Sequence, residues 1–374
     1  MSDIDDDFEK VAHSGGKVTF KIQDGESGRT CSISLTHEVA NRRFVISGIY
    51  ALLPHGIPVG TIQNLGIGAR NSPPAPGCIP VFIVSDQEGF FGRTCPACKK
   101  YFRLRSGAPV ILCPYCGVRS ATQDFLTEAQ KKYIGGYVQT FCDAFESGKD
   151  ATIDMDQLGR EAAVNARPLY YEEEKQQTRI DCVACGAASD VMGLYGFCPE
   201  CGHRNALAVV NQILDALEDR VSNPRYSAEN QRSLRDMEWR NIIRDCVASF
   251  EGFGRDLLQC LAKLPATPAR RKAAGEINFH NPIKVAESLK ALFDIDLLIG
   301  IDSKDREFIR KRFHRRSIYE HKSGQVDEEY VAKSGDTGVK IGQIIREGSS
   351  NAATLIRLVR IMAKNFDDGF HSIN

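Results

Sequence analysis

The sequence predicts a multidomain α+β protein, with a small antiparallel β domain at the N-terminus, two four-cysteine zinc ribbons and an all-α helical bundle at the C-terminus. Three observations predict this fold class. Short runs of β-branched and aromatic residues, separated by Gly and Pro, occupy the first 90 residues. Four Cys-x-x-Cys pairs follow. Beyond about Asn205, apolar residues recur at steps of three and four, as on one face of a helix.

A length of 374 residues is typical of two or three domains. We predict a β-rich domain over residues 1–90, a first ribbon with a helix over 91–150, a linker with a second ribbon over 151–204, and the helical bundle over 205–374. Lys and Arg number 48, as do Asp and Glu, so the chain is not a globally basic, histone-like binder. A local basic site remains compatible with this balance.

The sequence predicts no targeting or membrane segment. No run of about 18 apolar residues occurs, so we expect no transmembrane helix and no membrane association. The acidic start, Met1 to Asp7, lacks the basic and apolar regions of a signal peptide. We therefore expect a cytoplasmic protein. In that compartment, 13 cysteines indicate metal binding or catalysis rather than disulfides.

The β-rich segment follows a loose acidic lead-in over residues 1–16. Gly, Pro and Asn clusters, notably Asn71 to Gly77, separate its strand-like runs, as expected for a small antiparallel sheet or barrel. The Gly-rich segment from Gly60 to Gly68 lacks the Lys and Ser/Thr of a phosphate-binding loop and is typical of turns. The predicted strands are Lys17–Ile22, Cys31–Leu35, Arg43–Tyr50 and Ile79–Val84.

The cysteine pairs form two matched units, with fourteen residues between the pairs of the first unit and twelve in the second. Two thiolates separated by two residues bind one tetrahedral metal from a tight turn, and two such pairs complete its coordination. This spacing predicts two structural Zn²⁺ ions, each in a zinc ribbon, with no open position for catalysis. The predicted ligands are Cys95, Cys98, Cys113 and Cys116 in the first unit, and Cys182, Cys185, Cys198 and Cys201 in the second.

Basic and aromatic residues are interleaved just beyond the first Cys pair, from Lys99 to Arg105. Such a pattern can bind nucleic acid. The simpler interpretation, which we favour, is that Tyr101 and Phe102 form the small core of the ribbon while Lys99 and Lys100 are solvated.

The C-terminal region predicts a bundle of about five helices. The second carries a clear apolar stripe from Trp239 to Leu264, in which Gly252 and Gly254 are expected to bend the helix and Pro265 and Pro268 to end it. A further helix is expected in the ribbon region, at about Asp124 to Phe145. The predicted bundle helices are Ala206–Val221, Ser233–Leu264, Ile283–Ile299, Asp305–Glu320 and Ala352–Phe366, with a loop from Lys322 to Gly348.

The fourth bundle helix concentrates positive charge. Between Lys304 and Lys322, eight Lys or Arg residues face three acidic residues, an excess that predicts an anion-binding surface. Arg310, His314, Ser317 and His321 share one stripe of this helix, which is also what a solvated polar face looks like. Arg316 lies off that stripe, so it converges with His321 only if the helix ends or distorts near Glu320, or if a second subunit completes the site.

The arrangement Arg315-Arg316, four residues, then His321 resembles the core motif of HEPN-superfamily domains. The likeness extends from about Leu234 to the C-terminus and includes Phe253-Gly-Arg-Asp-Leu257 in the long helix. Its further parts are Val326-Asp-Glu-Glu-Tyr330, Gly335-Asp336 and Gly342-Gln343. HEPN domains are four- or five-helix bundles that often form dimers, and many are metal-independent endoribonucleases of bacterial toxin and defence systems.

The resemblance implies a catalytic pair of Arg316 and His321 at a homodimer interface, supported at the phosphate by Arg315 and Ser317. RNA would be cleaved by attack of a 2′-hydroxyl on the adjacent phosphodiester. The position after the arginine is often Asn, Asp or His in that family, and Ser317 departs from this pattern. The alternative is a non-catalytic, zinc-containing scaffold whose ribbons and β module bind partners and whose bundle dimerises or binds RNA without cutting it. The sequence identifies neither the trigger nor the partner.

Overall fold

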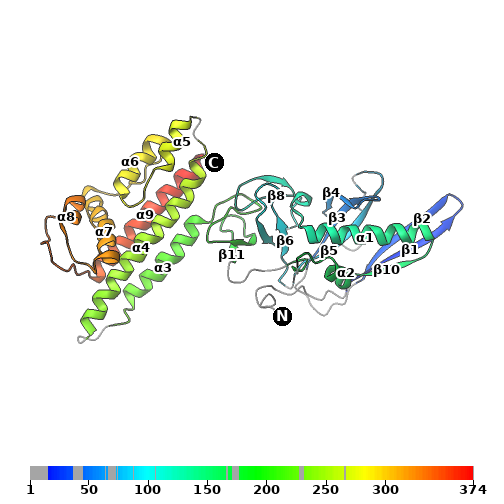
Figure 1. The fold of residues 1–374 in the computed structure, drawn as a ribbon, viewed down its shortest axis with the longest axis horizontal. Coiled ribbons are helices and arrows are strands. Elements are labelled where there is room, and N and C mark those ends of the chain that lie inside the picture. The colour runs from blue at the N-terminus through cyan, green and yellow to red at the C-terminus, as the bar shows by residue number, and fades with distance from the viewer. Residues whose placement is uncertain are drawn as a thin grey trace. The chain divides into compact units, whose positions relative to one another are not determined.

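The computed structural model describes residues 16–36, 45–63, 65, 73, 75–86, 88–105, 107–165, 167–170, 177–226, 231–264 and 267–373. Most of the predicted N-terminal lead-in lies outside these residues, as do parts of the Gly-rich segment and of the expected linker. The chain divides into two compact units, Met1–Asn205 and Ala206–Asn374, each described here by itself (Figure 1). Within the described residues, no helix has both the length and the apolar character needed to cross a membrane.

Two small antiparallel sheets form one part of the first unit, as predicted. β1 (Lys17–Gly25) pairs with β2 (Gly28–Thr36) and with β10 (Ala151–Asp154). The second sheet has the order β4-β3-β5, formed by β3 (Ile46–Leu52), β4 (Ile57–Ile62) and β5 (Cys78–Val84). β10 had no counterpart among the predicted strands, and it brings a segment from beyond the first ribbon into the N-terminal sheet.

Helix α1 (Glu128–Ser147) provides the core of this part with its apolar face. A capping box between Thr127 and Gln130 begins the helix, and Gly148, with φ 66°, ends it in the left-handed conformation. Phe20 of β1 meets the ring of Tyr137 edge-on at 5.4 Å. The short α2 (Met155–Glu161) follows β10 and contacts α1.

The two four-cysteine units share one sheet, which the sequence did not reveal. β6 (Phe91–Thr94) and β7 (Tyr101–Leu104) belong to the first unit, and β11 (Gln177–Asp181) and β12 (Ala188–Met192) to the second. The strand order is β11-β12-β7-β6, so β7 and β12 join the units edge to edge. A separate hairpin of β8 (Val110–Leu112) and β9 (Arg119–Ala121) leads into a short 3-10 helix (Thr122–Phe125).

A buried ion cluster stabilises this junction. The guanidinium of Arg103 is fully buried and contacts Asp86 and Asp190, with 2.6 Å between Nη2 and Oδ2 of Asp190. Burial raises the pKa of Asp86, and the charge of Arg103 opposes that rise. The favoured interpretation of the basic-aromatic segment is confirmed, because Tyr101 and Phe102 are buried while Lys99 and Lys100 are exposed.

The second unit is the predicted helical bundle. Helices α3 (Ala206–Ser222), α4 (Arg232–Leu261) and α9 (Ser349–Ile373) pack side by side (Figure 1). α7 (Ser303–His321) packs against α4, α9, α6 (Pro282–Phe293) and α8 (Glu328–Ser334). The predicted stripe of α4 is buried from Trp239 to Leu261. Leu264 was predicted wrongly: it is 48% exposed because the helix ends at Leu261.

Three other predictions for this unit were wrong. α6 ends at Phe293 rather than near Ile299, because Asp294 adopts a left-handed conformation with φ 60°. Pro268 begins a helix, α5 (Pro268–Gly275), instead of ending one, since proline is tolerated in a first turn and the Thr267 side chain caps it. α8 lies in the predicted loop and begins at the capping carboxylate of Asp327.

Gly254 has a packing role in the middle of α4. A Cβ at this position would lie 2.1 Å from Cε1 of Phe279, so only glycine leaves room for that ring. Phe279 is buried, stacks on Phe366 and meets Phe250 edge-on. This contact attaches the loop between α5 and α6 to the centre of α4.

Candidate functional site

Each four-cysteine unit brings its sulfur atoms together. In both groups all four Sγ atoms lie within 4.8 Å of one another. The separations are 3.7 Å for Cys95–Cys116 and Cys98–Cys113, and 3.6 Å for Cys182–Cys201 and Cys185–Cys198. A disulfide requires about 2.05 Å, and all 13 cysteines are free. Each group therefore has the composition and the spacing of a site that could hold a metal ion.

The basic helix α7 has two functionally distinct faces. Arg315 faces the interior, where Nη1 donates to Glu347 and Nη2 donates to Asp336, both at 2.8 Å. Its Nε donates to the Tyr330 hydroxyl, which donates in turn to Asp336. The structure thus places Arg315 in a buried structural network, where every side of its guanidinium is engaged. This corrects its predicted role at a phosphate.

Much of the predicted positive excess is neutralised in the same way. Lys311 pairs with Glu307 and approaches Asp336, and Arg312 lies near Glu347. The acidic partners Asp336 and Glu347 come from segments outside the basic helix, so a count of charge along that helix overlooked them. The helix is therefore not a continuous anion-binding surface.

The opposite face of α7 borders a pocket of about 450 Å³. Arg316, Ser317 and His321, which the sequence analysis named as the catalytic pair and its neighbour, are all among the residues that line it. His321 is the last residue of α7, and Lys322 follows as its C-cap. The pocket wall also includes His280, His314 and Lys322.

Arg316 lies at the inner wall of the pocket. Its side chain is 21% exposed, and Nε is 3.2 Å from Oε1 of Glu320 on the next turn of α7. Nη2 lies 3.7 Å from Oε2 of Glu251, a buried carboxylate on α4. The guanidinium is thus positioned by two acids yet remains at the pocket surface, where it could contact an anionic ligand.

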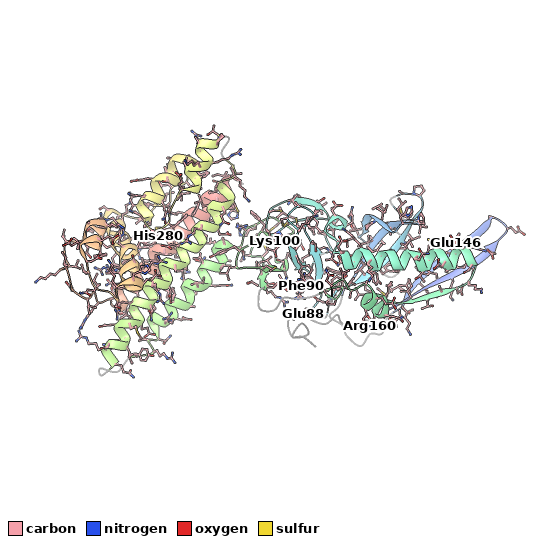
Figure 2. The ribbon with its side chains drawn as sticks, in the orientation of Figure 1. Glu88, Phe90, Lys100, Glu146, Arg160 and His280 are labelled. Carbon is pink, nitrogen blue, oxygen red and sulfur yellow. The ribbon has the colours of Figure 1, made fainter. Side chains whose placement is uncertain are left out.

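Glu251 and His280 form a second element of the site, which the sequence analysis missed. Nδ1 of His280 lies 2.9 Å from Oε1 of Glu251, and Oε2 of the same carboxylate accepts from Arg255 at 2.9 Å. His280 is labelled within the helical unit in Figure 2, and its side chain is 57% exposed. The only sequence signal was the segment Asn278-Phe279-His280-Asn281-Pro282, and it indicates no more than a turn.

The other two histidines have different surroundings. Burial lowers the pKa of His314, and the charges of Arg310, Lys333 and Lys284 lower it further. Its Nε2 is buried without a hydrogen-bond partner. The side chain of His321 is 70% exposed, with Nε2 3.8 Å from Oε2 of Glu320, beyond hydrogen-bonding distance.

The rim of the pocket carries paired charges. Lys322 contacts Asp327, and Lys333 lies 2.6 Å from Glu329. Arg316 also has acidic neighbours, Glu320 and Glu251, and it shares the pocket lining with three imidazoles and a serine hydroxyl. Comparison of the chain with family models, with curated proteins and with solved structures found no match in any of the three.

Proposed function

We propose that the second unit is a HEPN-type, metal-independent endoribonuclease of a bacterial defence or toxin-like protein. The observation that carries this proposal is the pocket lined jointly by Arg316, Ser317 and His321. Transesterification of RNA needs groups that transfer protons and a cation for the charge that develops on the phosphate. Imidazoles and a guanidinium supply these without a metal ion.

In this mechanism Arg316 stabilises the phosphorane-like transition state, and His321 transfers a proton. Ser317 donates its hydroxyl to a phosphate oxygen, in place of the Asn, Asp or His frequent at this position in the family that the motif resembles. The resemblance also implies a homodimer, which light scattering coupled to gel filtration tests directly. RNA is the expected partner. Pull-down from cells would identify the molecule that triggers the activity.

We propose that each four-cysteine group holds one structural Zn²⁺. A tetrahedral zinc with bonds of about 2.3 Å places its sulfur ligands about 3.8 Å apart, close to the separations of 3.6 and 3.7 Å. Four thiolates leave no open coordination position, so the ions would support the shared sheet and take no part in the reaction.

The test is cleavage of RNA by wild type, His321→Ala and Arg316→Ala, with His55→Ala in the first unit as an exposed control. We expect 2′,3′-cyclic phosphate ends from wild type and the control in EDTA, and at least about a 100-fold slower reaction from both pocket variants. Circular dichroism must show that the chelator leaves the protein folded. Cleavage that requires Mg²⁺ would contradict the metal-independent mechanism, and RNA binding without cleavage would support the non-catalytic scaffold instead.

A further inference from the structure

The pair of Glu251 and His280 combines a buried carboxylate with an accessible imidazole. Glu251 is 1% exposed and belongs to α4, whereas His280 precedes α6 and lines the pocket, and the two side chains are in contact. A carboxylate only accepts hydrogen bonds, so Nδ1 of His280 must carry the hydrogen of their 2.9 Å contact. In the neutral ring, Nε2 is then the free acceptor.

The backbone on both sides of His280 is anchored. Phe279 is buried against Gly254, as described above. On the other side, the Asn281 side chain accepts from the backbone N–H groups of Ile283 and Lys284 and so caps α6. An imidazole between two fixed neighbours, held by a buried acid, is preorganised for proton transfer.

The three histidines that line the pocket differ in whether a ring nitrogen contacts a carboxylate. Nε2 of His314 is buried without a hydrogen-bond partner. Nε2 of His321 lies 3.8 Å from Oε2 of Glu320, which is too far for a hydrogen bond. Among the described residues that line the pocket, His280 is the histidine whose ring nitrogen lies within hydrogen-bonding distance of a carboxylate. A carboxylate on Nδ1 stabilises the imidazolium that forms when Nε2 takes a proton, which is the requirement of a general base.

We propose that His280 is the general base of this site, Glu251 its positioning residue and His321 the general acid. This inference rests on the proposed ribonuclease function. Nε2 of His280 removes the proton of the ribose 2′-hydroxyl, and the 2′-oxygen forms a bond to phosphorus. The bond between phosphorus and the 5′-oxygen breaks, and His321 protonates that oxygen. The products are a 2′,3′-cyclic phosphate and a 5′-hydroxyl, and proton exchange with water restores both histidines.

The assignment is tested with two RNA substrates, one with the natural 5′-oxygen and one with sulfur at that bridging position. A thiolate leaves without protonation, so the second substrate needs a base but no acid. His280→Gln retains a hydrogen-bonding side chain but cannot transfer protons, and we expect it to be about 10²- to 10⁴-fold slower than wild type on both substrates. We expect His321→Ala to be slow on the oxygen substrate and to recover on the sulfur substrate.

Three results would overturn the inference, and a fourth would exclude the role of Glu251 in it. Near wild-type rates for His280→Gln refute its role, and recovery of that variant on the sulfur substrate makes it the acid. Absence of cleavage by wild type on both substrates refutes the ribonuclease proposal and this inference with it, so the two failures are distinguishable. Glu251→Gln should lower kcat with little change in KM, and an unchanged kcat excludes its positioning role. Fluorescence of Trp239, on α4, verifies that each variant is folded.

Discussion

The contact between Gly254 and Phe279 gives a sharp prediction, because helix propensity and packing oppose each other there. Gly254→Ala in the interior of α4 would stabilise an isolated helix by about 1 kcal/mol. In the protein, the new Cβ would lie 2.1 Å from Cε1 of Phe279 and 2.5 Å from its Cδ1. The ring must retreat from 2.1 Å to the 3.4 Å of ordinary contact, a shift of about 1.3 Å.

Packing should decide the outcome. Phe279 is 1% exposed and lies between Phe250 and Phe366, so its ring has no solvent to move into. Overpacking of a core typically costs about 1–3 kcal/mol, which exceeds the gain in propensity. After subtraction of the propensity gain of about 1 kcal/mol, we expect Gly254→Ala to lower the free energy of unfolding by up to about 2 kcal/mol. It should also displace His280, the residue after Phe279, and weaken its 2.9 Å contact with Glu251.

Urea denaturation followed by Trp239 fluorescence measures this change in the correct unit, because Trp239 is the only tryptophan in the chain and belongs to α4. Gly275→Ala is the matched control, since nothing lies within 4 Å of a Cβ at that exposed position of α5. Phe279→Leu should partly relieve Gly254→Ala in the double variant. If Gly254→Ala proves as stable as wild type or more stable, packing against Phe279 does not explain the glycine.

Three further predictions follow from the buried networks and the cysteine groups. Arg315→Ala removes the cation that donates hydrogen bonds to both Asp336 and Glu347, leaving them only the longer cationic contacts of Lys311 and Arg312. It should cost about 3–5 kcal/mol in Trp239-monitored denaturation; a loss under about 1 kcal/mol contradicts the network. Burial opposes ionisation of Asp336, but hydrogen bonds from its partners outweigh this and lower its pKa. The contribution of Asp336 to stability is therefore complete above the unfolded-state pKa of about 4 and is lost as the pH falls through the lower native pKa. On acidification below about pH 4, Asp336→Asn should lose less stability than wild type. Equal losses contradict this. Metal analysis should find two zinc ions per chain in wild type and one in Cys113→Ser; an unchanged content excludes the first four-cysteine site.

The fold was predictable from sequence where apolar residues recur at regular steps within one continuous segment. The apolar stripe of α4 is long and regular, and it is buried as predicted from Trp239 to Leu261, with Leu264 as the exception. The short helices α5 and α8 have eight and seven residues, too few to establish a period, and their caps were the only available signal. The pairing of β10 with β1, and of β7 with β12, depends on contacts between distant segments, which spacing along the chain does not encode.

The residues of the candidate site also differ in whether a pattern within one segment could identify them. Arg316, Ser317 and His321 were named from a motif within one helix, and all three line the pocket, although Arg316 lies off the stripe of the other two. His280 and Glu251 are 29 residues apart on different elements and meet only because Phe279 packs into the space left by Gly254. The acids that engage α7 were missed for the same reason.

The adjacent arginines of α7 illustrate why a motif alone does not assign roles. Successive residues of an α-helix point about 100° apart, so Arg315 and Arg316 cannot serve the same surface. Arg315 is buried and binds Asp336 and Glu347, which fixes the segment after α8 against the helix. Arg316 reaches the pocket and approaches Glu251, the carboxylate that also holds His280. One arginine therefore supports the fold of the pocket wall, while the other couples the helix to the group that we propose transfers the proton.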